Sequence, residues 1–384
     1  MTTNNQIPYG RHNVSEQDVQ AVSKILRGDW LTTGPAVEEF ESKLKALAKA
    51  DAVAVSSGTA ALHCAYASVG IKPGDEIITT PLTFIATQAT AALLGAKIVF
   101  ADTQLDTGNI DPAQIESKIT KKTKAITMVD YAGHPCEIDE IKSIAQKHGI
   151  YLIEDASHSI GSTYKNMPVG GLADLTTFSF FPTKNVTTGE GGAVLSNNIR
   201  LLEKARKFGR QGLVRNEEEF VLTSDGPWHQ EVHEFGLNYR LPDVLCALGI
   251  SQLEKLGEFK LERQRLFNKY IEYLSCIPEL MMPTKRDYVD PMWHLFPLRV
   301  PSKLRKELFG YLRAAGFLVQ VNYFPAHLHP VFSHQHSLGD FPNSEKYYSE
   351  EISLPMFVDS MRFTDEYFER LTFTIQSFIS GITR

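Results

Sequence analysis

Short apolar runs alternate with helical stretches over the first half of the chain. Between several runs, apolar residues recur at helical spacing, as in AALHCAYASVG and CEIDEIKSIAQKHG. Nearly continuous apolar strands that alternate with helices are typical of a mostly parallel sheet covered on both faces. The pattern therefore predicts an α/β fold. The predicted strands are residues 52–55, 76–80, 97–102, 124–130, 151–156, 176–181 and 193–196.

The pattern changes after about residue 240. A long helical pattern covers residues 243–274, and HLFPLRV, KELFGYLRAAG, LVQVNYF and a final helical segment follow it. We expect a large domain with an N-terminal arm over residues 1–250 and a smaller α+β domain over residues 251–384. The longest irregular stretch, 213–234, is expected to be either a functional loop or a surface excursion.

Composition narrows the class of protein. The 384 residues are 43% hydrophobic, and the formal net charge is -6. Nucleic acid and anionic membranes require a basic surface, so neither partner is expected. The N-terminus lacks the features of a signal peptide, and no apolar run reaches the ~18 residues of a membrane span. The four cysteines show no CxxC or zinc-ligand spacing, which indicates buried thiols in a reducing compartment and a cytoplasmic protein.

Lys184 is the first candidate for chemistry. In a mostly parallel sheet the ligand lies at the carboxyl ends of the strands, and Lys184 follows the predicted strand 176–181. The next residues, TTGEGG, carry three glycines that allow another group to approach closely. An amine there can form a Schiff base with an aldehyde cofactor, and the alternative is a solvated surface charge.

Asp155 and His158 lie at the end of the strand 151–156. A carboxylate at this place either caps a helix or holds a pyridine nitrogen protonated, as pyridoxal phosphate (PLP) requires. His158 either lies against a cofactor ring or fills space.

The segment SSGTAAL, residues 56–62, runs from a strand into a helix through Gly58. Such a helix start is either an anion site or an ordinary capped helix. Ser179 could donate to the same anion and Phe84 could stack on an aromatic cofactor, although structural roles are the alternatives for both.

Several other kinds of site are not expected. The four histidines of HLHPVFSHQH have neither the acidic or cysteine partners nor the spacing of a metal site, so no metal is expected. The sequence contains no GxSxG elbow of a serine hydrolase and neither of the nucleotide-binding loops GxxxxGK[ST] and GxGxxG.

Four motifs taken in order carry a family resemblance. SSGTAAL, EDASHSIGSTY, FSFFPTKNVTTGEGGAVLSN and GLNYRLPDVLCALGISQL resemble the PLP-dependent sugar aminotransferases of the DegT/DnrJ/EryC1/StrS family, which have the fold-type I architecture. IPYGRHNVSEQDVQAV, GDWLTTGPAVEEFE, VDYAGHPCEID, DGPWHQ and YYSEEISLPM resemble the members of pseudaminic acid synthesis. Those members transfer an amino group from L-glutamate to the C4 ketone of a UDP-linked 4-keto-6-deoxy-N-acetyl hexosamine.

The resemblance implies a role for each candidate. Lys184 carries the Schiff base and moves protons, Asp155 pairs with the pyridinium nitrogen, and His158 completes the catalytic set. Proton transfer at neutral pH requires that the pKa of Lys184 lie below the ordinary ~10.4. His158 and Phe84 flank the ring, and Gly58, Thr59 and Ser179 hold the phosphate. Asn238 reaches the phosphate from the neighbouring subunit, which implies a homodimer with shared active sites.

The resemblance also implies a set of sugar-nucleotide contacts. Many relatives have SFHP where this chain has SFFP, so Phe181 replaces a histidine near these contacts. The alternatives are transamination of a different nucleotide ketosugar and a non-catalytic binding protein. A dehydratase of the family has histidine at the place of Lys184. The implied sugar contacts are Tyr9, Asp29, Trp30, Leu31, Thr32, Tyr323, Phe324, Pro325, Ala326 and His327.

Overall fold

A seven-stranded sheet forms the centre of the computed structural model, which describes residues 6–382. The strand order is β1–β9–β8–β5–β4–β2–β3. Each strand coincides with one of the predicted apolar runs to within two residues at either end. The strands are β1 (Asp51–Val55), β2 (Glu76–Thr79), β3 (Lys97–Phe100), β4 (Thr123–Val129), β5 (Tyr151–Asp155), β8 (Leu175–Ser179) and β9 (Gly192–Ser196).

The sheet is mostly parallel, as predicted. β3, β2, β4, β5 and β8 pair in parallel, and β9 runs antiparallel to both β8 and β1. β9 reverses direction because the chain returns from β8 through the loop 180–191 without a crossover helix. Lys184 lies in this loop.

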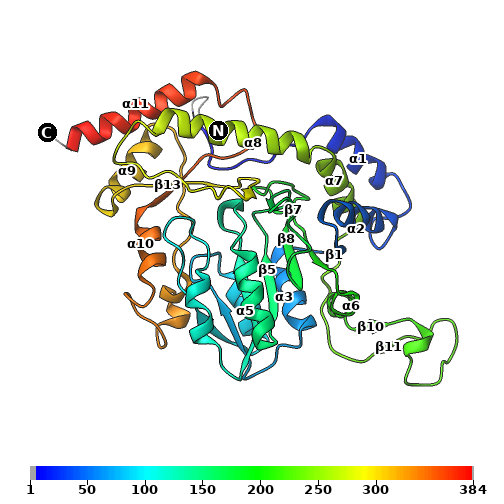
Figure 1. Cartoon of the computed structure of the whole chain (residues 1–384). Helices are drawn as coiled ribbons and strands as arrows, with labels where there is room; N and C mark the ends of the chain where they lie inside the picture. Colours follow the sequence, from blue (N-terminus) through cyan, green and yellow to red (C-terminus); the bar gives the residue numbers. More distant parts are fainter. Residues whose placement is uncertain (1–5, 383–384) are drawn as a thin grey trace.

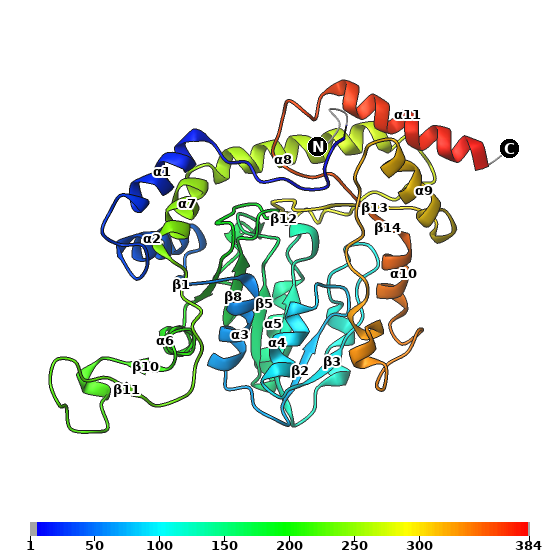
Figure 2. The same cartoon turned by 180° about the vertical axis from the view of Figure 1, so that it is seen from behind.

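Helices cover both faces of the sheet (Figures 1 and 2). Successive strand residues point to opposite faces: Val53 and Val55 pack with α3, α4 and α6, whereas Ala52 and Ala54 pack with α2 and α7. α5 packs on the same side as α2, further along the sheet. These helices are α2 (Pro35–Ala48), α3 (Gly58–Ser68), α4 (Ala86–Leu93), α5 (Ile138–His148), α6 (Ile199–Phe208) and α7 (Asp243–Glu254).

The C-terminal part has its own core around the pair β13–β14 and the helices α8, α9 and α11. The long helical pattern is two helices rather than one, because the backbone turns at Lys255, whose Nζ lies 2.5 Å from a carboxylate oxygen of buried Asp18. The remaining elements are α1 (Glu16–Leu26), α8 (Leu256–Leu274), α9 (Ser302–Ala314), α10 (Pro342–Glu350), α11 (Asp365–Ile382), β13 (Phe296–Arg299) and β14 (Glu351–Leu354).

The division into residues 1–250 and 251–384 stays a prediction. Ile7 packs in the C-terminal core, whereas Ala326 and Phe341 pack in the core of the central sheet. A small sheet consists of β6 (Thr163–Tyr164), β7 (Met167–Pro168) and β12 (Val289–Asp290). Short 3₁₀ turns lie at Pro112–Gln114, Glu116–Lys118, Tyr131–Gly133, Glu217–Glu219, Ala326–Leu328 and Pro330–Phe332.

The irregular stretch forms an arm. Its hairpin of β10 (Leu213–Val214) and β11 (Glu231–Val232) projects past α6 and away from the body of the chain (Figures 1 and 2). None of the helices within residues 6–382 combines the length and the apolar content that a membrane crossing requires.

Candidate active site

A cavity of about 450 Å³ opens at the carboxyl ends of the parallel strands. Its walls come from the segments that follow β1, β2, β5 and β8, where the sequence predicted a ligand, and from the C-terminal part of the chain. The lining residues are Tyr9, Ser57, Gly58, Thr59, Leu62, Thr83, Phe84, Ala86, Thr87, Val129, Asp155, Ser157, His158, Ser179, Phe181, Thr183, Lys184, Glu190, His294, Asn322 and Tyr323.

Lys184 is held by a loop that folds back on itself. The backbone N–H of Lys184 donates to the carbonyl of Phe181 at 2.9 Å, and the N–H of Phe180 donates to the carbonyl of Gly191 at 2.8 Å. Burial lowers the pKa of the Lys184 amine to about 8, against the opposing effect of Asp155. The amine is therefore suited to both accept and release a proton near neutral pH.

Asp155 accepts three hydrogen bonds at the end of β5. Thr87 Oγ1 donates to one carboxylate oxygen at 2.8 Å, and the backbone N–H and Oγ of Ser157 donate to the other at 3.2 and 2.6 Å. No helix starts directly after Asp155, so the helix-cap alternative is wrong. The three donors fix the orientation of the Asp155 carboxyl group, which lines the cavity and can pair with a cationic partner there.

The start of α3 forms a cradle for a small anion. Ser57 is the N-cap, and its Oγ accepts from the N–H of Ala60 at 3.0 Å. A Cβ on Gly58 would lie 2.7 Å from Cβ of Ser179, so only glycine permits this approach. The backbone N–H groups at a helix start and the Ser179 hydroxyl are the donors that a phosphate needs.

His158 and Phe84 both line the cavity, and their place beside a cofactor ring stays a prediction. His158 Nε2 lies 3.1 Å from the hydroxyl of Tyr323, and the two rings are stacked at 6.1 Å. Burial and the Lys184 amine hold the pKa of His158 well below its usual range, so its imidazole is neutral.

The predicted sugar contacts fall into two groups. Tyr9 and Tyr323 line the cavity, and Asn322 Nδ2 donates to the Tyr9 hydroxyl at 2.6 Å. The others do not line it within this one chain: residues 29–32 and Phe324 are exposed, and Pro325 and Ala326 are buried behind the wall. Asn238 is also exposed and outside the lining.

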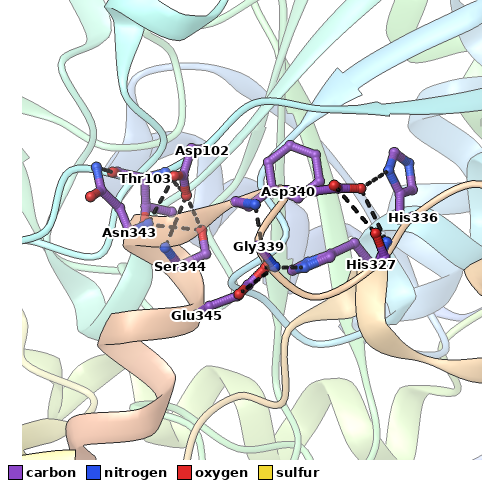
Figure 3. A network of polar contacts seen from close by, with 11 residues as sticks. Asp102, Thr103, His327, His336, Gly339, Asp340, Asn343, Ser344 and Glu345 are labelled. Atoms are coloured by element: carbon purple, nitrogen blue, oxygen red, sulfur yellow. Dashed lines mark hydrogen bonds and ion pairs between the residues drawn. The ribbon is translucent and has the colours of Figure 1, made fainter.

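His327 is not among the residues that line the cavity. It belongs instead to a polar network with Glu345 and Asp102 nearby (Figure 3). It is 0% exposed, and its Nε2 lies 3.0 Å from Oε1 of Glu345 in the first turns of α10. Glu345 also accepts from the N–H of Gly339, and Asp102 caps α10 through the N–H groups of Asn343 and Ser344. His327 therefore anchors the chain behind the wall, and a contact with the sugar stays a prediction.

The histidine-rich loop does not gather metal ligands. His336 pairs with Asp340 at 3.4 Å, and His327 pairs with Glu345. Among residues 6–382, no group of three or more His, Cys, Asp or Glu side chains is arranged to hold a metal ion.

Sequence reasoning missed several lining residues. Thr87 could have been found, because it lies one helical turn after Phe84. His294 and Asn322 come from distant segments and carry no local signal. Glu190 lies within the glycine turn that was interpreted only for its backbone.

The cavity fits PLP by the chemistry of its side chains. An amine with a lowered pKa suits the aldehyde, the hydrogen-bonded carboxylate of Asp155 suits the ring nitrogen, and the cradle at Gly58 suits the phosphate. Phe84 and His158 offer flat surfaces for the ring.

Known proteins resemble the chain over nearly its whole length. Among curated relatives, the spore coat polysaccharide biosynthesis protein SpsC of Bacillus subtilis is 37% identical, with 92% of this chain and 93% of that protein covered. The UDP-4-amino-4,6-dideoxy-N-acetyl-beta-L-altrosamine transaminase of Campylobacter jejuni is 38% identical, with 91% and 92% covered.

Solved structures agree with the fold. PseC of Helicobacter pylori, an aminotransferase of pseudoaminic acid biosynthesis, superposes with a TM-score of 0.90 at 30% identity, over 98% of this chain and 100% of that one. Spr1654 of Streptococcus pneumoniae in its PLP-form superposes with a TM-score of 0.90 at 25% identity, over 98% of this chain and 99% of that one. The family model matches residues 12–372. The chain thus belongs to the DegT/DnrJ/EryC1/StrS aminotransferase family and is a PLP-dependent aminotransferase.

Proposed function

We propose that the enzyme transfers the amino group of L-glutamate to the C4 ketone of a UDP-linked 4-keto-6-deoxy-N-acetyl hexosamine, giving UDP-4-amino-4,6-dideoxy-N-acetyl-β-L-altrosamine. The observation that carries the transfer is the Lys184 amine with its lowered pKa in one cavity with the hydrogen-bonded Asp155. The choice of sugar is supported by the names of the Campylobacter and Helicobacter relatives.

Each active-site residue has a separate role in the proposed reaction. Bound PLP supplies an electron sink for the carbanion that forms when the donor loses its Cα proton. Lys184 takes that proton from Cα of glutamate and, in the second half of the cycle, delivers a proton to C4 of the sugar. Asp155 would pair with the ring nitrogen, and the neutral His158 and Phe84 would flank the ring. The cradle at Gly58, Thr59 and Ser179 would hold the phosphate.

We further propose that the enzyme acts as a homodimer with shared active sites. Its ligands carry a phosphate, a diphosphate and carboxylates, but Lys184 is the single lysine or arginine that lines the cavity within residues 6–382. Asn238 lies outside this lining on an exposed strand-like segment beside Arg240. A second copy that presents Asn238 and its neighbours to the cavity would supply the missing donors.

We place the reaction in the cytoplasm. All four cysteines are free thiols, three of them buried, which suits a reducing compartment.

A second candidate is the same transfer onto a different nucleotide ketosugar. Phe181 favours it, because this aromatic ring is 46% exposed and presents an apolar surface to the cavity. The Bacillus relative SpsC, with a similar identity, belongs to spore coat polysaccharide biosynthesis.

The absorbance of the bound cofactor tests the proposal. We expect the long-wavelength band of the PLP–protein complex to bleach with L-glutamate and to return with the UDP-linked 4-keto-6-deoxy-N-acetyl hexosamine. Borohydride should fix PLP on the Lys184 peptide, as seen by mass spectrometry. A band that bleaches but does not return with this sugar would favour the second candidate.

The test variant is Lys184→Ala, and its matched control is Lys97→Ala. The side chain of Lys97 is 64% exposed and lies outside the cavity. Lys184→Ala should lose borohydride fixation and turnover, and Lys97→Ala should keep both. Turnover in Lys184→Ala would refute the role of Lys184.

A further inference from the structure

His294 is a buried histidine in the cavity wall to which the mechanism gives no role. It precedes β13, is 5% exposed and lines the cavity. Its ring centroid lies 4.3 Å from that of His158, with the ring planes tilted by 36°. The Nδ1 atoms of both histidines are buried without a hydrogen-bond partner among the described residues, so the contact between them is ring against ring.

The backbone around His294 is fixed on both sides. The His294 N–H donates to the carbonyl of Ala132 at 2.8 Å. The preceding residue, Trp293, stacks on Phe267 at 4.0 Å, and buried Arg263 donates to the Trp293 carbonyl at 3.0 Å. The backbone position of His294 is therefore set by contacts with Ala132, Arg263 and, through Trp293, Phe267, none of which lines the cavity.

Asn185 joins the two histidine segments. Its Nδ2 donates to the carbonyl of His158 at 2.9 Å and lies 3.4 Å from the carbonyl of Met292, two residues before His294. Because Asn185 follows Lys184, one residue connects the lysine loop, the segment after β5 and the segment before β13. The separation of the two imidazoles is thus set by the same bond network that places Lys184.

Both imidazoles are neutral. The pKa of His294 lies well below its usual range, because of burial first and then because of His158, Lys184 and Arg263. Arg263 donates to the carbonyls of Trp293 and Met356 and forms no ion pair within residues 6–382, and its charge contributes to the lowered pKa of His294. Two neutral imidazole rings can pack closely, whereas a positively charged imidazole would repel the Lys184 ammonium group.

We propose that His294 is a positioning residue of the active site, which holds the ring of His158 against the flat face of the cofactor by ring-to-ring packing. The Nε2 atom of His158 is hydrogen-bonded to the Tyr323 hydroxyl, whereas its Nδ1 atom has no hydrogen-bond partner among the described residues. A single hydrogen bond leaves the His158 ring free to tilt. The His294 ring, whose centroid lies 4.3 Å from that of His158, restricts that tilt. The inference rests on the proposed place of His158 beside the cofactor.

Two substitutions distinguish the contribution of the flat His294 ring from that of its nitrogen atoms. His294→Phe keeps a flat ring, and we expect its dissociation constant for PLP and the induced circular dichroism of the bound cofactor to stay within about threefold of wild type. His294→Ala removes the ring and should weaken PLP binding and reduce the circular dichroism by about 10-fold. Equal losses in both variants would overturn the proposal. If His294→Ala fails to fold, His294→Leu takes its place with the same expectation.

A double-mutant cycle tests whether His294 acts through His158. The variant His158→Ala/His294→Ala should bind PLP no more weakly than His158→Ala alone, whereas independent losses that multiply would overturn the proposal. Phe363→Ala removes a buried ring of the C-terminal core outside the cavity, so it should lower Tm but leave PLP binding unchanged. Unchanged binding in His158→Ala would overturn the inference while leaving the Lys184 experiment intact.

Discussion

Lys184 shows how one residue is tuned for two tasks. It must bind covalently as a free amine and then carry protons, and burial brings its pKa to about 8 while Asp155 keeps it from falling further. Asp155 in turn accepts hydrogen bonds from the hydroxyl groups of Thr87 and Ser157. The chemistry of the lysine thus depends on hydroxyl groups that do not touch it.

The pH dependence of stability reports this tuning. In the cofactor-free protein the folded state releases the Lys184 proton near pH 8, whereas the unfolded chain keeps it up to about 10.5. The unfolded state therefore binds more protons between these values, and the folded state gains stability there as the pH rises. Lys184→Met cannot titrate, so we expect its Tm advantage over wild type to shrink between pH 7 and pH 10. An advantage that is constant with pH would show that Lys184 keeps an ordinary pKa.

The site residues that could be predicted from the sequence are those within continuous motifs. Lys184, Asp155, His158, Gly58, Thr59, Ser179 and Phe84 all line one cavity, because each follows a strand of the same parallel sheet. His294 and Asn322 were not readable, since only the packing of the C-terminal part brings them there. His327 could not be oriented from the sequence, because its partner Glu345 lies in another helix.

At the scale of elements, β9 controls the shape of the anion cradle. Gly192 pairs with both Val55 of β1 and Ser179 of β8, so it lies between the two strands whose ends form the cradle. A Cβ at this residue would lie 2.3 Å from the carbonyl oxygen of Ser57 and 2.8 Å from the nitrogen of Gly58. These are backbone atoms, so any side chain must displace the start of α3.

Gly192→Ala should therefore affect both stability and cofactor binding. We expect a loss of about 1–3 kcal/mol in the free energy of unfolding, from strain in a packed region, and weaker binding of PLP measured by titration. The control is Gly257→Ala in α8, where a Cβ meets nothing within 4 Å and helix propensity favours alanine. Unimpaired PLP binding in Gly192→Ala would mean that the cradle tolerates the shift.

Strands were easier to predict than the way segments meet. The apolar runs located the strands of the central sheet because both of its faces are covered, which makes each strand nearly continuous in apolar residues. The turn at Lys255 was missed because the helical pattern continues through it, and the ion pair of Lys255 with Asp18 joins residues more than 200 positions apart in the sequence.

At the scale of the whole molecule, the contacts within a single chain do not explain why the arm exposes large apolar side chains. The arm extends away from the body (Figure 1), and Trp228 within it is 73% exposed, while Phe235 directly after it is 96% exposed. Monomeric proteins rarely expose such groups together, so a partner surface is expected. Asn238 lies four residues beyond the arm, so the exposed surface of the arm is continuous in sequence with the residue that we propose to reach the cavity of a second copy.

Hybrid dimers test whether two chains share each active site. Lys184→Ala and Asn238→Asp, whose added charge repels a phosphate, should each be inactive. If Asn238 serves the cavity of the other chain, a hybrid contains one site with both changes and one site with neither. Co-expression with two different tags and purification through both should then give about half the wild-type turnover per dimer.

The same hybrid distinguishes the opposite arrangement. If Asn238 served the cavity of its own chain, one site would lack the Lys184 amine and the other would contain the Asn238→Asp change. Each site would then carry one inactivating substitution, so the hybrid would be as inactive as its parents.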